Sequence, residues 1–268
     1  MKDAEGSVTV VPALEKALDI LEYIAQRGTY VTVKEVSNGL GIPLATAYRT
    51  IKYLWSRKYL QTKSEAGGEY YLGPQLLYLA HLITKQFDLI SIAKPVMNEL
   101  AAKSGQTAQL GVLQDFGVVY IEQALPAKPV NIIAALRTVI PVNVSASGKV
   151  LVAHLPAGEQ DFFLKNAHLP PQTENSIVDI DEFKQELQKV KEQGYALDHE
   201  EYARGIGCAA APIQDCTGQT IAAIGITGPI VDYIDARKLE HLVQLVKRAA
   251  AKISQELGEV PIEMPRFS

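Results

Sequence analysis

The feature that most constrains the fold lies in residues 32–60, where two short helical stretches flank a turn rich in glycine. Thr32, followed three residues later by Glu35, forms a capping-box pattern in which each residue satisfies a backbone N–H of the other. A helix is therefore expected to begin there. Gly39 and Gly41 provide backbone that can take positive φ, so this helix is expected to end there and the chain to turn sharply.

The second helix of this pair has one apolar face and one face suited to a partner. Pro43 fits its first turn, and an inward stripe at helical spacing is expected from Ala47, Thr50, Ile51 and Leu54. The opposite face is small, hydroxyl-bearing and cationic, which suits the major groove of DNA. The predicted DNA-binding residues are Thr32, Leu44, Ala45, Thr46, Tyr48, Arg49, Lys52 and Lys63.

Local charge agrees with this interpretation. Between Pro43 and Ser64 every charged residue is a cation, namely Arg49, Lys52, Arg57, Lys58 and Lys63. The whole chain has 26 Lys and Arg against 30 Asp and Glu, a net charge of −4, so any affinity for nucleic acid must come from a local patch. A solvated basic helix face would carry the same charges. The helix, glycine turn and second helix together favour DNA.

Other elements complete a small first domain. Pro12 opens a helix that ends near Gly28, with a predicted stripe of Leu14, Ala17, Leu18, Leu21, Ile24 and Ala25. Residues 59–63 and 69–72 are expected to be strands around a tip at 64–68, a hairpin of the kind called a wing. A helix after Pro74, apolar on more than one face, is expected to connect this domain to the next.

The remaining chain alternates between helical and strand patterns and predicts an α+β domain. Helices are expected at residues 92–103, 150–154 and 181–192 and in a last stripe from Leu239 to Leu257. Strands are expected at residues 107–113, 118–124, 131–136, 195–199, 208–214 and 220–227.

Several motifs taken together resemble the IclR family of bacterial transcriptional regulators. They are YYLGP at residues 70–74, VSASGKVLVA at 144–153, GYALDHEE at 194–201 and the segment from GIGCAAAPIQD to IAAIGITGP at 205–229. The resemblance implies a winged helix-turn-helix DNA-binding domain (1–73), a linker helix (74–88) and a GAF-like effector-binding and oligomerisation domain (89–268). It also implies homodimers or homotetramers that act on double-stranded DNA operators.

Two positions depart from the family pattern. Lys58 stands where the family usually has glycine, and Gly225 stands where a small hydroxyl residue is common.

The resemblance also implies an effector pocket. Its residues correspond here to Ala146, Ser147, Asp198, Ile206, Cys208 and Thr227. Residues 144–148 lead into a helix expected to begin near Lys149, and the free N–H groups of a helix start favour an anion, so Gly148 joins the predicted site. We expect a small carboxylate metabolite there. Because like charges repel, Asp198 is expected to hold backbone or ligand hydroxyl groups instead of the carboxylate.

Enzymatic alternatives are less well supported by the residues. The SGK at residues 147–149 resembles the end of a phosphate loop, but Asn143 replaces the first glycine and Val150 replaces the hydroxyl residue that would hold magnesium. Cys208, His199 and Asp198 could form a cysteine-histidine hydrolase, although nothing in the sequence brings them together. A sensor that binds only another protein would leave the basic face unexplained.

No catalytic residue, cofactor or metal is predicted. The five histidines show no metal-ligand spacing, and Cys208 and Cys216 are expected to be free thiols. No stretch approaches the roughly 18 apolar residues that a membrane span needs, and the first residues lack a signal pattern. The expectation is a cytoplasmic protein with no membrane partner.

Overall fold

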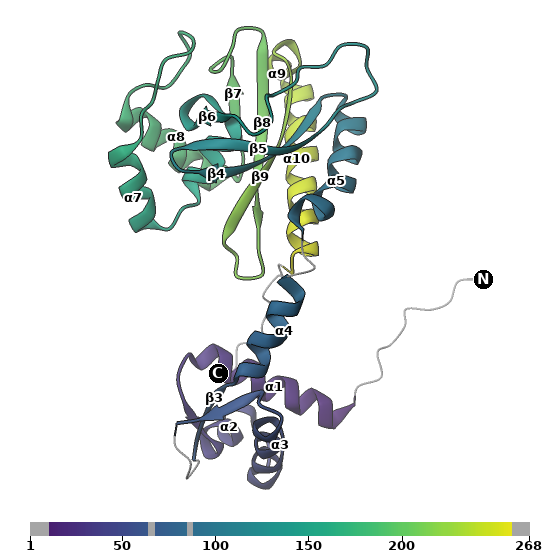
Figure 1. Ribbon diagram of the computed structural model, residues 1–268, viewed down its shortest axis with the longest axis vertical. Coiled ribbons are helices and arrows are strands. Elements are labelled where there is room, and N and C mark those ends of the chain that lie inside the picture. Colours follow the sequence, from purple (N-terminus) through teal and green to yellow (C-terminus); the bar gives the residue numbers. More distant parts are fainter. Residues whose placement is uncertain (1–10, 64–67, 85–87, 259–268) are drawn as a thin grey trace, which may run out of the picture. The chain divides into compact units, whose positions relative to one another are not determined.

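The computed structural model describes residues 11–63, 68–84 and 88–258, with only the backbone at 81–84. The chain divides into two compact units, one within residues 1–86 and the other within 87–261. The first unit, here called the head, contains α1 (Pro12–Arg27), β1 (Val31–Thr32), α2 (Val33–Leu40), α3 (Leu44–Ser56), β2 (Leu60–Thr62), β3 (Glu69–Leu72) and α4 (Pro74–Thr84) (Figure 1).

The start of α2 confirms the predicted capping box. Thr32 Oγ1 accepts the backbone N–H of Glu35 at 3.2 Å, and Glu35 Oε2 accepts the backbone N–H of Thr32 at 2.7 Å. Gly41 ends the helix with φ +63°. The prediction for Gly39 is wrong, because Gly39 lies inside α2 and is absent from the residues with positive φ. A methyl group at Gly39 would collide with the ring of Tyr23, so this glycine allows α1 and α2 to pack closely.

Helix α1 buries Ile24 of the predicted stripe and packs Leu21 against the same core, but it leaves the first leucines of the stripe exposed. Its buried side chains are Ile20, Tyr23 and Ile24, whereas Leu14 and Leu18 are 57% and 49% exposed. The apolar pattern of α1 contains two faces, and packing against α2 selects the face that carries Tyr23. Helix α3 follows its prediction more closely, since Ala47, Ile51 and Leu54 are buried and Thr50 is half-buried.

The predicted wing is present as an antiparallel pair. Leu60 of β2 lies opposite Leu72 of β3, and β1 adds a third strand through Val31 opposite Tyr70. Strand β1 was not predicted, because a strand of only two residues leaves no pattern of alternation to recognise. Most of the predicted tip, residues 64–67, lies outside the described residues.

The second unit is built on a six-stranded antiparallel sheet with the order β6-β5-β4-β9-β8-β7. Its strands are β4 (Thr107–Gln114), β5 (Gly117–Ala124), β6 (Val139–Pro141), β7 (Ala196–His199), β8 (Ile206–Gln214) and β9 (Thr220–Pro229). Its helices are α5 (Leu89–Ser104), α6 (Ala146–Ala153), α7 (Ala157–Asn166), α8 (Ile180–Gln193), α9 (Val231–Ile234) and α10 (Ala236–Glu256), with a 3-10 turn at Val142–Val144.

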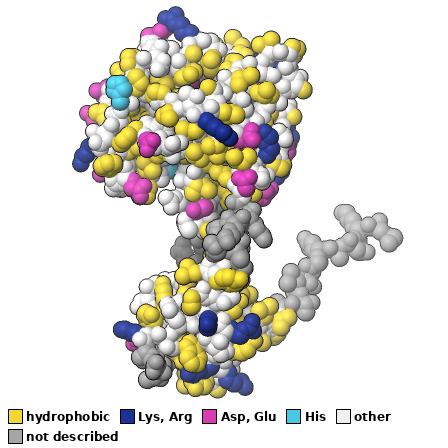
Figure 2. All heavy atoms as spheres, viewed as in Figure 1, with side chains coloured by type: hydrophobic (Ala, Val, Ile, Leu, Met, Phe, Trp, Pro, Cys, Tyr) yellow, Lys and Arg dark blue, Asp and Glu magenta, His cyan; other side chains and the backbone are white. Residues whose placement is uncertain are grey.

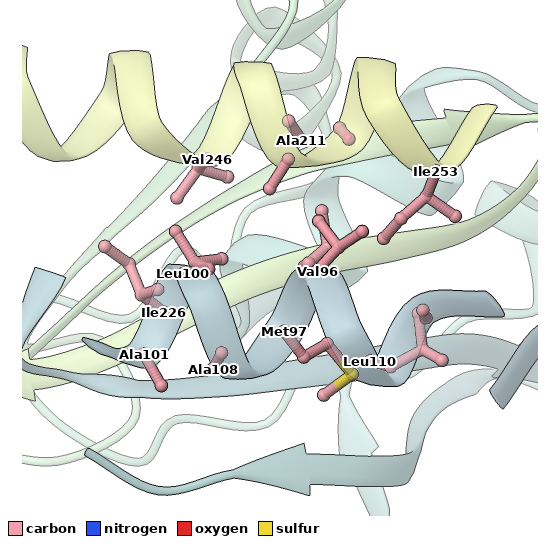
Figure 3. Close-up of a cluster of buried hydrophobic side chains, with 14 of the residues drawn as sticks. Val96, Met97, Leu100, Ala101, Ala108, Leu110, Ala211, Ile226, Val246 and Ile253 are labelled. Carbon is pink, nitrogen blue, oxygen red and sulfur yellow. The ribbon is translucent and has the colours of Figure 1, made fainter. Parts of the chain in front are cut away.

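Each face of this sheet has its own core. Helices α5 and α10 cover one face, where Val96 and Leu100 meet Val246 and Ile253 above sheet residues such as Ile226 (Figure 3). On the other face α6 packs against the central strands and α8 packs against α6. The core on that side includes Val150, Phe183, Leu187, Ala210 and Ala223. Alternate residues of each strand therefore serve opposite cores.

Two predictions for this unit are wrong, and one helix was missed. Residues 131–136 form no strand, and the strand that pairs with β5 is β6, with Val139 opposite Val119. Helix α6 begins at Ala146, three residues before the predicted start, with Ser145 as its N-cap. Helix α7 was not predicted, because its apolar residues do not follow one clear stripe.

The backbone conformation at Lys58 shows what is lost when lysine replaces the glycine of the family pattern. It follows α3 with φ +63° and its side chain is exposed. That left-handed conformation costs a residue with a Cβ atom about 1–2 kcal/mol, a cost that glycine avoids.

Lys58→Gly is expected to raise the free energy of unfolding of the head by about 1 kcal/mol, because it removes this strain. Arg57→Gly, at φ −90°, is the matched control and is expected to lower that free energy by roughly 0.5–1 kcal/mol. Urea unfolding followed by circular dichroism measures both. A loss of stability in Lys58→Gly equal to that of the control would contradict the strain argument.

Candidate functional site

A groove on the head lies between the start of α2 and the start of α3. Its lining residues are Thr32, Val33, Lys34, Leu44, Ala45, Tyr48, Arg49 and Gly68. The capping box fixes Thr32 at the first turn of α2, and the buried stripe of α3 turns Tyr48 and Arg49 outward. Gly68 brings the edge of the wing to the same groove.

The groove unites five of the eight residues predicted to contact DNA: Thr32, Leu44, Ala45, Tyr48 and Arg49. Thr46 is half-buried on α3, and Lys63 is exposed after β2. Neither of them lines the groove, and neither does Lys52. Sequence reasoning missed Val33, Lys34 and Gly68, although their closeness to Thr32 and to the predicted wing tip was a usable signal.

Aromatic rings surround one of the cations on α3. Lys52 Nζ lies 4.9 Å from the centre of the Trp55 ring and 5.8 Å from that of Tyr48. These cation–π contacts keep the ammonium close to the helix surface. On the face drawn in Figure 2 the head carries mostly Lys and Arg among its charged side chains, whereas Asp and Glu side chains gather on the second unit.

A pocket opens on the face of the second unit's sheet that α6 also covers. It has about 500 Å³ of empty space including its mouth, and its lining residues are Gln109, Tyr120, Ile132, Ile133, Ala134, Ala135, Ile140, Val144, Ser145, Asp198, Tyr202, Ile206, Cys208 and Thr227. The apolar residues 132–135, predicted as part of a strand, instead form one wall of this pocket.

Strand register brings the polar groups of the pocket floor together. Asp198 lies opposite Cys208 across β7 and β8, and Cys208 lies opposite Thr227 across β8 and β9. Cys208 Sγ is 3.3 Å from Thr227 Oγ1, which donates to Gln109 Oε1 at 3.0 Å. The floor is therefore a polar row from β7 across β8 and β9 to β4.

Beyond this row, the hydroxyl groups of Tyr120 and Ser145 lie 3.2 Å apart. Ser145 also caps α6 by accepting the N–H of Gly148 at 3.3 Å. Burial raises the pKa of Tyr120 to about 12, so the phenol stays protonated and acts as a hydrogen-bond partner.

Asp198 occupies an unusual position in the pocket. Its side chain is 1% exposed, and Oδ1 accepts the backbone N–H of Glu201 at 2.7 Å. Burial raises the pKa of Asp198, while the bond from Glu201 and the charge of Lys149 act in the opposite direction. Oδ2 has no hydrogen-bond partner within the structure. The bond from Glu201 agrees with the expectation that Asp198 holds backbone groups.

Among the predicted effector residues, Asp198, Ile206, Cys208 and Thr227 line the pocket, and Ala146, Ser147 and Gly148 do not. These three form the buried first turn of α6, directly after the lining residues Val144 and Ser145. Sequence reasoning missed the wall at 132–135, together with Gln109, Tyr120, Ile140 and Tyr202. The polar alternation of β4 and β5 could have indicated Gln109 and Tyr120.

Close packing around the first turn of α6 explains why this turn is buried. It also explains why Gly225 stands where the family commonly has a small hydroxyl residue. A methyl group at Gly148 would lie 2.6 Å from the Cα of Val142. A Cβ atom at Gly225 would lie 2.9 Å from the carbonyl oxygen of Ala209 and 3.4 Å from Ser147 Oγ. A hydroxyl residue at Gly225 would therefore require its neighbours to move.

Comparisons with known proteins agree with this architecture. Residues 81–255 match the family described as bacterial transcriptional regulator IclR C-terminal, and residues 13–64 match the IclR helix-turn-helix domain. The HTH-type transcriptional repressor AllR of Salmonella typhi is 30% identical over 93% of this chain and 91% of its own length. The chain belongs to the IclR family. It is therefore a DNA-binding transcriptional regulator with an effector-binding second domain, as the sequence predicted.

Other similar proteins extend this comparison. The HTH-type transcriptional regulator XynR of Escherichia coli is 28% identical over 93% of this chain and 98% of its own. The solved structure of IclR from Thermotoga maritima is 28% identical, with a TM-score of 0.61 over 91% of this chain and 98% of that one. The Agrobacterium tumefaciens repressor BlcR, at 24% identity, has the same fold with a TM-score of 0.67 over 92% of this chain and 97% of its own. The predicted α+β fold class with an N-terminal winged helix-turn-helix is confirmed.

The hydrolase constellation is not assembled in this IclR-family chain. Asp198 and His199 are neighbours in β7, so their side chains point to opposite faces of the sheet. Leu197, which shares the face of His199, packs against the core under α5 and α10. Burial raises the pKa of Cys208 well above its usual value, and the nearby Asp198 acts in the same direction, so the thiol is not activated as a thiolate.

Neither a metal site nor a membrane-spanning helix occurs among the described residues. Within them, no three His, Cys, Asp or Glu side chains gather as a metal site would require. None of the described helices combines the length and apolar character needed to cross a membrane.

A buried ion pair fixes the part of the pocket that contains Asp198. Lys149 of α6 is fully buried, and its Nζ lies 2.7 and 2.8 Å from the two carboxylate oxygens of Glu201. Glu186 of α8 is a second, weaker partner at 3.5 Å. Because Glu201 also donates its N–H to Asp198, the pair links α6 to the loop between β7 and β8.

Glu201→Gln is expected to lower the free energy of unfolding of the second unit by about 3 kcal/mol, because it leaves the buried ammonium of Lys149 with only the more distant Glu186. Glu174→Gln is the matched control, since Glu174 pairs with Arg204 where the side chains are 59% and 76% exposed. That loss is expected to stay below about 1 kcal/mol. Equal losses of unfolding free energy in urea would show that the buried ion pair stabilises the unit no more than the exposed pair does.

Proposed function

We propose that this regulator binds an operator in double-stranded DNA through the groove of the head and acts as a homodimer or homotetramer in the cytoplasm. A small organic acid in the pocket of the second unit changes that binding, and no catalysis is involved. The observation that carries the proposal is the pairing of an outward α3 face containing Arg49 with a polar pocket beside the start of α6.

The groove has the chemistry that DNA recognition needs. Arg49 is exposed on α3 and its guanidinium can contact a guanine edge or a phosphate. Lys34 adds a second cation at the start of α2, where its ammonium can contact a phosphate. Leu44 and Ala45 offer small or apolar contacts of the kind that meet a thymine methyl group.

Arg49→Ala is expected to weaken operator binding by about 1–3 kcal/mol if the contact to a base is bidentate. Lys189→Ala changes the net charge equally but lies on α8, and it is expected to leave the affinity unchanged. Fluorescence anisotropy with a labelled operator measures both.

The affinity should also fall with salt, with a log–log slope of about −0.9 per phosphate neutralised, and a flat salt dependence would refute DNA binding by this face.

Self-association is supported by apolar surface on the head. Val11, Leu14 and Leu18 lie at helical spacing at the start of the chain's first helix and are 56%, 57% and 49% exposed. Leu77 and Tyr78 of α4 are 75% and 56% exposed. Such surface is expected to be covered by a second copy of the chain, as reading a two-fold operator requires.

Sedimentation at micromolar concentration is therefore expected to show at least a dimer. Replacing both Leu14 and Leu18 with Glu is expected to shift the protein towards a smaller species, because charge would enter the apolar contact. Val178→Glu, at a side chain that is 52% exposed in the second unit, is the control and should change nothing. A monomeric native protein would exclude the proposed assembly.

The start of α6 supports an acidic effector. Val144 and Ser145 line the pocket, and the helix that follows at Ala146 presents N–H groups that have no partner within the helix. Together with the helix dipole these groups favour a carboxylate at that end of the pocket. The acid is proposed to lie against Ile206, Cys208 and Thr227.

A titration of operator binding in the presence of small carboxylic acids tests this part of the proposal. The effective acid should change operator affinity, and operator DNA should change the affinity for the acid by the same factor. If no acid in a broad panel altered either affinity, the effector proposal would fail while DNA binding by the head would stand.

A further inference from the structure

We propose that the effector is a hydroxy acid, a small carboxylic acid that also carries a hydroxyl group, and that this hydroxyl donates a hydrogen bond to Asp198 Oδ2. The inference rests on the proposed function of the pocket and narrows its ligand class. Keto acids without a hydroxyl group and aromatic acids without one are excluded as preferred effectors.

The first step concerns Asp198 itself. The side chain lines the pocket, is 1% exposed, and has one oxygen bonded to the N–H of Glu201 at 2.7 Å. The other oxygen, Oδ2, is buried and has no hydrogen-bond partner among the described residues. A buried acceptor without a partner is costly, so a ligand that supplies a donor gains that interaction on binding.

The second step concerns the cations near Asp198. No Lys, Arg or His is among the described lining residues. The buried ammonium of Lys149 on α6 is held by Glu201 at 2.7 and 2.8 Å and by Glu186 at 3.5 Å. Asp198 therefore repels a ligand carboxylate and accepts from a neutral hydroxyl.

The third step is the polarity of the remaining pocket. Gln109 uses its oxygen to accept from Thr227 at 3.0 Å, so its amide N–H groups remain the part that can serve a ligand acceptor. Only one of the paired hydroxyl groups of Tyr120 and Ser145 donates to the other, so one further hydroxyl hydrogen is available in that pair. Donors thus gather near β4, β5 and the start of α6.

The hydrogen-bond acceptor Asp198 and the hydrogen-bond donors lie at opposite sides of the pocket floor. Asp198 is on the edge strand β7, and Gln109 is three strands away on β4, with Cys208 and Thr227 between them. A ligand that satisfies both sides has an acceptor-rich end and a donor-bearing end. A carboxylate towards α6 and a hydroxyl towards Asp198 meet this requirement in one small molecule.

The test is isothermal titration calorimetry on the full-length native protein with matched acids. The sets are lactate, pyruvate and propionate; 3-hydroxybutyrate, acetoacetate and butyrate; mandelate, benzoylformate and phenylacetate; and D-gluconate against D-sorbitol, which lacks the carboxylate. In a set whose body fits, the hydroxy acid is expected to bind about ten- to a hundredfold more tightly than its keto partner. D-Gluconate is expected to bind more tightly than D-sorbitol.

Asp198→Asn supplies the decisive variant. The amide keeps one oxygen for the N–H of Glu201 and replaces Oδ2 with a donor, so the preference for hydroxyl over keto should collapse or reverse. Asp181→Asn is the matched control, because it makes the same chemical change at a side chain of α8 that is 76% exposed and does not line the pocket, so the hydroxyl-to-keto ratio should stay unchanged. Circular dichroism and operator binding without acid verify that both variants are folded.

Several results would overturn the inference. They are a keto acid that binds the native protein as tightly as its hydroxy partner, an unchanged ratio in folded Asp198→Asn, D-sorbitol binding equal to that of D-gluconate, and no binding by any hydroxy acid. If Asp198→Asn fails to fold, the native ratios alone decide. None of these results affects operator binding by the head, so failure of this inference is distinguishable from failure of the proposed DNA-binding function.

Discussion

The second unit depends on the ion pair between Lys149 and Glu201. Removing two charges from water is expensive, and here the cost is offset because the carboxylate meets the ammonium with both oxygens, at 2.7 and 2.8 Å. The pair joins α6 to the loop between β7 and β8, and the N–H of Glu201 then positions Asp198. Thr173 and Ser176 hold the same loop through its carbonyl groups. One electrostatic contact thus sets the geometry of both the helix start and the acidic side of the pocket.

Elements with a strong local signal could be predicted from the sequence. The capping box of Thr32 and Glu35, the turn at Gly41 and the long stripe of α10 depend on neighbours within a few residues, and the structure confirms them. The predictions that failed depend on contacts between distant segments. The buried face of α1 is decided by Tyr23 against Gly39, and residues 132–135 are apolar because they line a pocket and not because they pair in a sheet.

The candidate site shows the same division. Asp198, Cys208 and Thr227 are far apart in the chain, and only the register of β7, β8 and β9 places them side by side. The family resemblance supplied these residues, whereas spacing alone could not. Gln109 and Tyr120 come from strands on the other side of the sheet's centre, and they join the pocket only because the sheet order places β4 beside β9. Sheet order is a non-local property that no sequence window contains.

The free pocket therefore carries a cost that the fold alone does not explain. A buried carboxylate oxygen without a partner typically costs about 1–3 kcal/mol, while the other oxygen of Asp198 helps to hold the loop by accepting the N–H of Glu201. That bond uses only Oδ1, so it does not account for the burial of Oδ2. Costs of this kind persist at binding sites, where a ligand relieves them and thereby stabilises one state of the protein. The unpartnered oxygen is thus best understood as part of ligand recognition and not as part of the core.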